Sequence, residues 1–473
     1  MARLNYQNHR ALAALSVQAR IVISEFEPQC LANSLWAFAT LGYRDSVVLY
    51  HLTQGVYEKA VDFNAQNIAN SLWALAKLPY QDNALAIKEL IRAAKDKAPS
   101  FNPQNITNSL CAIAKLDQQY QNHELIGVLI SAACSSASEF KAQNIANMLW
   151  AMATLSASIN KPAIAALATQ AMTLAKTFNK QNLANTLWAM AKLGYRDEKA
   201  LTALMVQICE KHSSFDAQEI SNILYAMAQL NYRDEASLTA LLERAWSLTP
   251  CFNIQNITNT LWSLACLGEV ERLQDFIKGI AFRVDLAASD FQKENMIQMH
   301  YVRLYCQLIL KIPLPCFFDG IVVSRDMLGI TTSRLQLEIA TVIRELGAHH
   351  GYSVLDEAIL NGISVDMLIK PHNIVVEVDG PFHFIRSADH KLSYHGPSQL
   401  KDLLLNAMGY RVLHITQAAW FSHSTTKAKK AYLSSTLSKK LSSTPESSIP
   451  FLHLKELRAR KAESSMPSTA APL

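Results

Sequence analysis

Apolar and polar positions in the first 270 residues follow a pattern that recurs seven times. Each copy starts with Phe, has Gln three residues later, and continues into an apolar stretch such as FNAQNIANSLWALAKL at 63–78. The glutamines are spaced 37 to 39 residues apart. A fixed period of this size is the sequence signature of a solenoid built from stacked structural repeats. The seven glutamines are Gln29, Gln66, Gln104, Gln143, Gln181, Gln218 and Gln255.

Each repeat contains two helical patterns, which we name helix A and helix B. Helix A is the stretch led by Gln, and helix B is the next apolar-periodic stretch, for example 83–97. A single pair of helices cannot bury its apolar stripe, whereas seven stacked pairs form a continuous core. The sequence therefore predicts an α-solenoid over residues 1–312, with seven repeats at 26–269 and capping helices at both ends.

A helical wheel of one A helix separates an apolar side from a polar side. At 100° per residue, Ile68, Leu72 and Trp73 fall on the apolar side, and Asn67 and Ser71 fall on the other. We therefore expect the recurring tryptophans to pack in the core, with base stacking as the alternative. The Asn that recurs three residues before each tryptophan position cannot discriminate bases, so we expect it to bond neighbouring backbone or neighbouring repeats.

Positions that read nucleic-acid bases should be polar, exposed and variable between repeats. The residue after each Gln fits this description, and so does the position four residues further, for example Ser71. Lysines on the same arc could contact phosphate. A plain solvated face is the alternative for the whole set. The candidate RNA-binding residues in the repeats are Asn67, Asn105, Asn144, Asn182, Glu219, Asn256, Lys77, Lys115 and Lys192.

The repeat resembles the octatricopeptide repeat, whose unit has this length and a core similar to LANSLWAFATLGY at 31–43. The resemblance covers roughly residues 4–270. Members of that family bind RNA, so the resemblance implies single-stranded RNA as a partner.

A different pattern follows Pro313 and Pro315. It predicts a helix at 334–347, strands at 352–360, 363–369 and 373–379, a helix at 399–408 and a strand at 410–416. Asn361-Gly362 between the first two strands is a hairpin signal. The sequence thus predicts a small α/β domain over 325–433. A Ser-, Thr- and Pro-rich tail at 441–473 is expected to be disordered, apart from a short basic helix near 451–463.

Two blocks of this domain, VDMLIKPHNIVVEVDGPFHF at 365–384 and LKDLLLNAMGYRVLHI at 400–415, resemble the RAP domain. RAP domains commonly follow helical repeats in proteins of organellar RNA metabolism, and they are similar to the restriction-endonuclease-like fold. A nuclease of that class holds a divalent metal between carboxylates on adjacent strands. The candidate catalytic and metal-binding residues are Asp366, Glu377 and Asp379, with Mg²⁺ or Mn²⁺ as the cofactor only if the domain is a nuclease.

The usual acid-x-Lys pair of such nucleases is incomplete here, because Asp379 stands where the lysine belongs. Lys401 or His383 would have to take its place, and both are also candidates for binding RNA. We therefore expect the domain to bind RNA and to cleave it poorly or not at all, with no cofactor. Eight of the 14 histidines lie between His349 and His423 without a metal-binding spacing, and are interpreted as surface or polar-network residues.

Composition narrows the remaining possibilities. The net charge is only +5, and the eight cysteines form no CxxC pair, so neither a strongly basic protein nor a zinc site is indicated. The absence of an apolar run of 18 residues, and of a secretory signal, predicts a soluble intracellular protein; an organellar or secreted-effector destination stays open. We expect sequence-selective binding of single-stranded RNA in RNA processing, stability or translation. The alternatives are an endonuclease guided by the repeats and a protein-binding scaffold, which the nearly neutral repeats favour.

Overall fold

The computed structural model describes residues 1–4, 6–78, 83–156, 160–283 and 291–442. Two compact units divide the chain, residues 1–214 and residues 215–473. Stacked helices are followed by a small α/β domain, so the predicted fold class is confirmed. The predicted domain limits at 312, 325 and 433 stay predictions. The predicted disordered tail and basic helix lie outside the described residues, except for 441–442, which end a helix.

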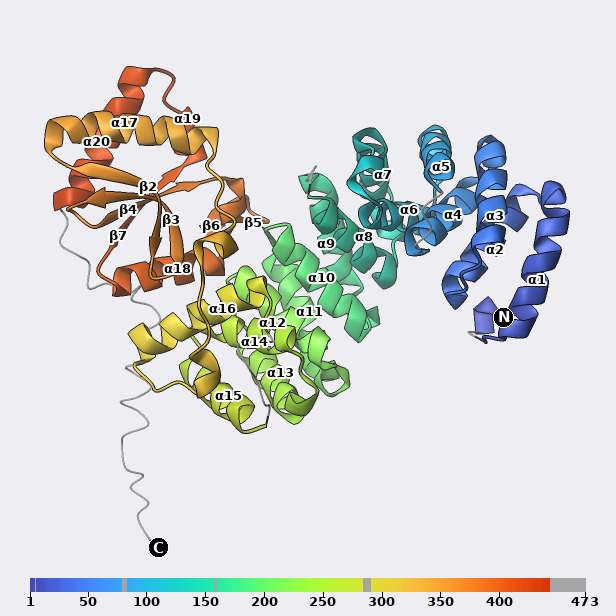
Figure 1. Ribbon diagram of the computed structural model, residues 1–473, viewed down its shortest axis with the longest axis horizontal. Coiled ribbons are helices and arrows are strands. Elements are labelled where there is room, and N and C mark those ends of the chain that lie inside the picture. The colour runs from blue at the N-terminus through green and yellow to red at the C-terminus, as the bar shows by residue number, and fades with distance from the viewer. Residues whose placement is uncertain (5, 79–82, 157–159, 284–290, 443–473) are drawn as a thin grey trace, which may run out of the picture. The chain divides into compact units, whose positions relative to one another are not determined.

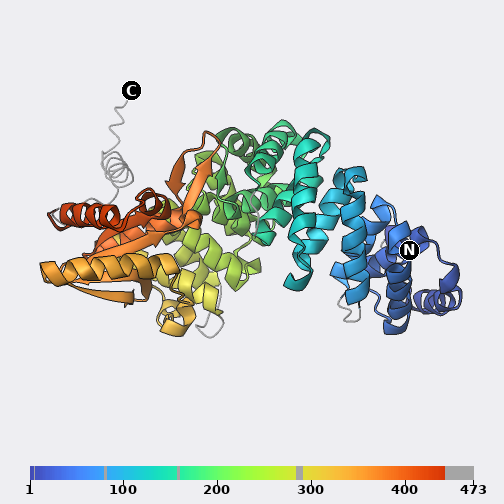
Figure 2. The ribbon, with the colours of Figure 1, turned by 90° about the horizontal axis from the view of Figure 1, so that it is seen from above.

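The first unit contains five of the repeats and the N-terminal cap α1 (His9–Val22). Consecutive repeats lie side by side in both views (Figure 1 and Figure 2), and consecutive A helices contact each other. The A helices are α2 (Pro28–Leu41), α4 (Ala65–Lys77), α6 (Pro103–Lys115), α8 (Ala142–Leu155) and α10 (Lys180–Lys192). The B helices are α3 (Ser46–Lys59), α5 (Ala84–Lys97), α7 (His123–Ser135), α9 (Lys161–Thr173) and α11 (Glu198–Lys211).

In three of the five A helices of this unit, the residue after the Phe caps the start of the helix with its side chain. The Phe follows a short 3₁₀ turn, such as η3 (Ala60–Asp62), and Phe63 itself is fully buried. Asn64 is the N-cap of α4, and its Oδ1 accepts a hydrogen bond of 2.9 Å from the backbone N–H of Asn67. A lysine at the end of α5 closes the junction, because Lys97 donates to the carbonyl oxygens of Val61 and Phe63, where its own repeat begins.

The second unit contains the last two repeats and the α/β domain. Its repeat helices are α12 (Ala217–Gln229), α13 (Glu235–Ser247), α14 (Ile254–Leu267) and α15 (Val270–Arg283). Helix α16 (Lys293–Leu304) packs against α14 and continues into a π-helical turn, η11 (Tyr305–Leu310). The apolar helix predicted to close the repeats is therefore present.

The α/β domain is built on a four-stranded sheet in the order β2-β3-β4-β7, in which only the β4–β7 pair is parallel. Helices α17 and α20 cover one face and α18 covers the other (Figure 1). The core between the sheet and α17 contains Met367, Ile369, Val376 and Ile415. The elements are α17 (Arg334–His350), β2 (Ser353–Leu360), β3 (Ile363–Lys370), β4 (Ile374–Asp379), α18 (Gly396–Ala407) and β7 (Arg411–Thr416).

Asn361 and Gly362 both have positive φ, 47° and 80°, as a two-residue hairpin turn requires. The predicted hairpin is confirmed. Sequence reasoning missed four elements: β5 (Phe384–Ser387), β6 (Leu392–Tyr394), α19 (Gln417–Phe421) and α20 (Thr426–Ser442). Strands β5 and β6 form an antiparallel hairpin that lies between β4 and α18 in the chain and outside the four-stranded sheet.

Close backbone contacts hold the α/β domain against the last repeats of the same unit. A Cβ at Gly396 would lie 2.0 Å from the carbonyl oxygen of Ala228 in α12, so only glycine fits at the start of α18. The β2–β3 turn reaches α16, where the Nε2 of His300 lies 2.7 Å from the carbonyl oxygen of Asn361. These contacts bring α18 beside the A helices α12 and α14.

Candidate functional site

Each A helix of the first unit has one narrow row of accessible side chains, which we name the A-helix stripe. In α4 it consists of Gln66, Asn70, Trp73 and Lys77, of which Gln66 and Lys77 are exposed and Asn70 and Trp73 are half-buried. The other sides of α4 pack against α2, α6 and α5. Because three sides of the helix are covered, its large accessible side chains follow the spacing i, i+4, i+7, i+11.

The stripe recurs along the first unit with the same chemistry. Exposed Gln and exposed or half-buried Asn occupy its first two positions in all five repeats, and half-buried Trp occupies the third in four of them. The members at the first three positions are Gln29, Asn33, Trp36, Gln66, Asn70, Trp73, Gln104, Asn108, Cys111, Gln143, Asn147, Trp150, Gln181, Asn185 and Trp188.

Lysine side chains lie over three of the indole rings. The Nζ of Lys77 is 4.9 Å from the centroid of the Trp73 ring, and that of Lys192 is 5.9 Å from the centroid of Trp188. An ammonium group over a ring marks a face that no core residue covers. Such contacts at exposed sites contribute only about 0.5–1 kcal/mol, so the lysine can leave the ring at small cost.

The expectation that the tryptophans are core residues is wrong in the first unit. Trp36, Trp73, Trp150 and Trp188 are half-buried and face the stripe. The helical wheel gave the wrong face for the tryptophans because it assumed one apolar side and one polar side. An A helix such as α4 instead packs against three other helices. Alanine and small polar residues fill its close contacts with neighbouring A helices, and the large indoles are left at the edge.

The expected exposure of the residue after each Gln is right for Cys30 and wrong in the other six repeats. Asn144 is half-buried, and the other five are buried: Asn67, Asn105, Asn182, Glu219 and Asn256. Each of these residues occupies the third position of its A helix and takes part in the N-terminal cap of that helix. The side chain of Glu219 accepts a bond of 3.0 Å from the backbone N–H of Asp216, and that of Asn256 accepts one of 3.2 Å from Asn253, as in a capping box.

The position four residues after these is buried as well. Six of the seven members have no more than 1 % exposed surface, and Ser34 alone is half-buried: Ser71, Ser109, Met148, Thr186, Ile223 and Thr260 are the six. The three candidate lysines Lys77, Lys115 and Lys192 are exposed on the stripe, as expected. Of the recurring asparagines, Asn259 in α14 is bonded to helix α16, because its Oδ1 accepts a hydrogen bond from Gln298 Nε2 at 3.2 Å.

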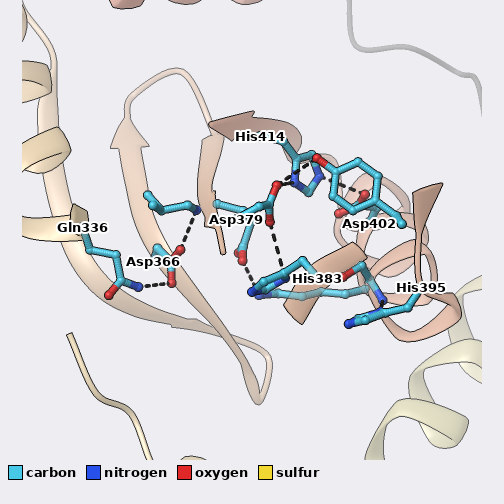
Figure 3. A network of polar contacts seen from close by, with 12 residues as sticks. Gln336, Asp366, Asp379, His383, His395, Asp402 and His414 are labelled. Carbon is cyan, nitrogen blue, oxygen red and sulfur yellow. Dashed lines mark hydrogen bonds and ion pairs between the residues drawn. The ribbon is translucent and has the colours of Figure 1, made fainter. Parts of the chain in front are cut away.

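Asp379 lies at the centre of a polar network on the α18 face of the sheet (Figure 3). It is 1 % exposed, and its Oδ2 accepts hydrogen bonds of 2.8 Å from both Tyr394 Oη and His414 Nδ1. The Nε2 of His414 donates in turn to Asp402 Oδ2 at 3.0 Å. Burial disfavours the imidazolium, but the bonds to Asp379 and Asp402 outweigh it and raise the pKa of His414 to about 10.

Glu377 and Lys401 form a buried ion pair beside this network. The Lys401 Nζ lies 2.7 Å from Glu377 Oε2, and the Glu377 side chain is 5 % exposed. Burial raises the pKa of Glu377 to about 7 against the opposing effect of Lys401. Burial also lowers the pKa of Lys401, but Glu377 and the other neighbours outweigh it and the net shift is upward. Lys401 and His383 both reach the carboxylates, the latter with Nδ1 3.4 Å from Asp379 Oδ1.

Asp366 is engaged by hydrogen bonds of its own. Its Oδ1 accepts from Gln336 Nε2 at 2.6 Å and its Oδ2 from the backbone N–H of Val378 at 2.6 Å (Figure 3). Within the described part of the chain, no group of three His, Cys, Asp or Glu side chains is arranged to hold a metal ion. Asp366, Glu377 and Asp379 therefore do not fit the metal site that a nuclease would need, because each is engaged by a different protein partner.

A pocket of about 360 Å³ lies where this network meets the stripe of the last two repeats. Tyr225 and Trp262 of α12 and α14 line one side, with ring centroids 5.4 Å apart and stacked at 27°. Glu377, Lys401 and His414 line the other side. All of these residues belong to the second unit.

Sequence reasoning missed most residues of this pocket, among them His414, Asp402 and Tyr394. One signal was available: His414 is the only charged or ionisable side chain inside the strand pattern VLHIT, where a buried position calls for a partner. The histidines were expected to be surface or polar-network residues, and His414 belongs to such a network.

These features define a two-helix-repeat solenoid that ends in a small α/β domain with a polar network on one sheet face. Residues 74–272 match the family described as RNA-editing substrate-binding complex 6 protein, and residues 376–436 match the RAP domain. Residues 60–72 match a protein family of unknown function. No curated protein matches the chain. The RAP resemblance is thus confirmed, whereas these matches do not name the octatricopeptide type of repeat.

Proposed function

We propose that this chain binds single-stranded RNA along the A-helix stripe and acts in RNA processing, stability or translation. The observation that carries the proposal is the periodic row of half-buried indoles with lysines over three of their faces. The name of the family that matches the repeats, RNA-editing substrate-binding complex 6 protein, supports RNA as the ligand.

The chemistry of the stripe suits unpaired bases. An indole face accepts any base by stacking, which contributes about 1–3 kcal/mol per base. The Gln and Asn amides beside it offer both a donor and an acceptor to base edges, and the lysine ammonium can move from the ring to a phosphate. Bases in a duplex have no free faces, so this surface favours single strands over double strands.

We propose further that the RAP domain holds RNA without efficient cleavage. Asp366, Glu377 and Asp379 each have a protein partner, so the nuclease alternative lacks a ligand set for its metal. Lys401 and His383 remain candidate RNA-binding residues of this domain.

None of the helices in the described residues is long and apolar enough to cross a membrane.

A titration of the purified full-length chain with nucleic acids tests the proposal. A labelled randomised single-stranded RNA should bind more tightly than duplex DNA of equal length. With few lysines on the stripe, affinity should fall only gently with salt. Equal or weaker binding of the single-stranded RNA would overturn the proposal.

A further inference from the structure

The pocket of the second unit has an excess of hydrogen-bond acceptors. Glu377 Oε1, Asp379 Oδ1 and Asp402 Oδ1 are buried atoms with no hydrogen-bond partner, and all three residues line the pocket. Glu377 and Asp379 are themselves only 4 % and 1 % exposed. A buried acceptor without a donor is unfavourable, so these atoms require a ligand that brings donors.

The neighbouring donors leave this need unmet: His383 Nδ1 lies 3.4 Å from Asp379 Oδ1 without making a hydrogen bond to it, and the others are engaged elsewhere. Both nitrogens of His414 are committed to Asp379 Oδ2 and Asp402 Oδ2, and Lys401 is bonded to Glu377 Oε2. Burial lowers the pKa of His395, which favours its neutral form, and its Nδ1 accepts from the backbone N–H of Ser398. Three carboxylates against two cations also disfavour an anion such as phosphate.

The opposite wall is aromatic and amide-rich. Tyr225 and Trp262 present a stacked pair, Tyr301 lies beside them, and Gln229 and Gln298 border the rings. Gln229 Nε2 donates to Tyr225 Oη at 2.8 Å, which fixes the tyrosine ring. A flat aromatic ligand with donors along one edge fits between such a wall and the carboxylates, and about 360 Å³ is enough for a nucleoside.

We propose that this pocket binds one unstacked guanine of the RNA, with the base against the half-buried ring of Tyr225, which stacks on the buried Trp262, and its Watson–Crick edge toward Glu377 and Asp379. Guanine is the one RNA base with two neighbouring donor groups on that edge, N1–H and N2–H₂, next to the acceptor O6. The donors meet the carboxylate oxygens, and the ammonium of Lys401 can donate to O6. The inference rests on the proposed RNA binding and adds a base preference at one position.

The test is isothermal titration of the full-length chain with the nucleoside monophosphates, which all carry the same phosphate. GMP should bind more tightly than AMP, CMP and UMP. Inosine monophosphate differs from GMP only by the missing N2 amino group and should bind about tenfold more weakly or worse, because a site built around that donor rejects its absence. Equal binding of GMP and inosine monophosphate, or no binding of GMP, would overturn the proposal.

Two variants separate the pocket from the stripe. Glu377→Gln keeps the size of the side chain and should reduce the preference for GMP over inosine monophosphate. Trp188→Leu, on the stripe of the first unit, should weaken RNA binding and leave GMP binding unchanged. RNA binding without GMP binding would overturn the guanine pocket alone, whereas GMP binding without RNA binding would overturn the proposed function alone.

Arginine amide is the probe for a different occupant, the guanidinium of a partner protein. It also brings several donors, but it lacks the O6 acceptor of guanine that Lys401 would meet. Competition by arginine amide with no binding of GMP would assign the pocket to a protein and contradict the inference.

Discussion

The Nζ of Lys115 lies 5.5 Å from the centroid of the Trp150 ring, although the two residues belong to consecutive repeats. Cys111 occupies the aromatic position in the repeat of Lys115, so the ammonium reaches the indole of the next repeat instead. The stripe therefore runs from one repeat to the next in this part of the first unit, as the binding surface for a continuous strand must.

Trp150→Ala should weaken RNA binding by about 1–3 kcal/mol, because one stacking face is lost. Since the indole is half-buried, the loss of stability should be smaller than the roughly 3–5 kcal/mol typical of a fully buried tryptophan. Fluorescence anisotropy with single-stranded RNA and thermal unfolding by circular dichroism measure the two effects. The control is Tyr57→Ala on helix B, where the ring is 42 % exposed and RNA affinity should not change. A variant with lower stability but normal RNA affinity would show that Trp150 serves packing and not RNA binding.

Asn256→Ala should destabilise the last repeat by about 1–3 kcal/mol, because a buried side chain loses its hydrogen bonds. Asn256 donates to Ser221 Oγ at 3.0 Å across the repeat boundary and caps its own helix through Asn253. Gln255→Ala, one residue away on the exposed stripe, should leave the unfolding temperature unchanged. If Asn256→Ala instead had normal stability and an altered base preference, Asn256 would be a base-reading residue, as the sequence predicted.

The repeat architecture could be predicted from the sequence because its signals are local. The Phe and the Gln recur at a fixed period, and the side chain of an Asn or Asp caps the start of five of the seven A helices. The face that binds a ligand could not be predicted, because Asn67 and Asn70 differ only in what packs against them. Contacts with the two neighbouring A helices bury Asn67 and leave Asn70 accessible, and no single repeat contains that information.

In the α/β domain too, local features could be predicted from the sequence and long-range contacts could not. Its hairpin was predictable because Asn361 and Gly362 suit positive φ, and its strands were predictable from their apolar runs. The polar network was not, because Asp379 and His414 lie 35 residues apart and meet only through the parallel pairing of β4 and β7.

His414 makes stability depend on pH. Its pKa in the folded chain is about 10, above the ordinary value of 6.5, so its contribution is complete below pH 6.5 and is lost as the pH rises toward 10. At about 1.36 kcal/mol per pKa unit, the upper bound is several kcal/mol. Glu377, whose pKa is about 7, still titrates in the lower part of this range, but it is present in both proteins of the comparison below.

The measurement compares the unfolding temperature of the wild-type chain and His414→Gln between pH 7 and pH 10. The advantage of the wild type should shrink steadily as the pH rises. An advantage that is constant over this range would mean that His414 is neutral in the folded protein.

Addition of Mg²⁺ or Mn²⁺ to the full-length chain should not produce cleavage of bound RNA or DNA. The carboxylates that would hold the metal are engaged by Gln336, Lys401 and His414. Gel electrophoresis of labelled substrates, with Asp379→Ala as the comparison, checks this. Metal-dependent cleavage by the wild type that disappears in Asp379→Ala would make the endonuclease the better account.

The central claim is that RNA lies on the A-helix stripe, and ultraviolet crosslinking tests it most directly. Bound single-stranded RNA is crosslinked to the full-length chain, and the modified peptides are identified by mass spectrometry. The account predicts crosslinks at Trp73, Trp150 and Trp188, which lie on the stripes of α4, α8 and α10. Crosslinks confined to the B helices, with these three tryptophans unmodified, would contradict it.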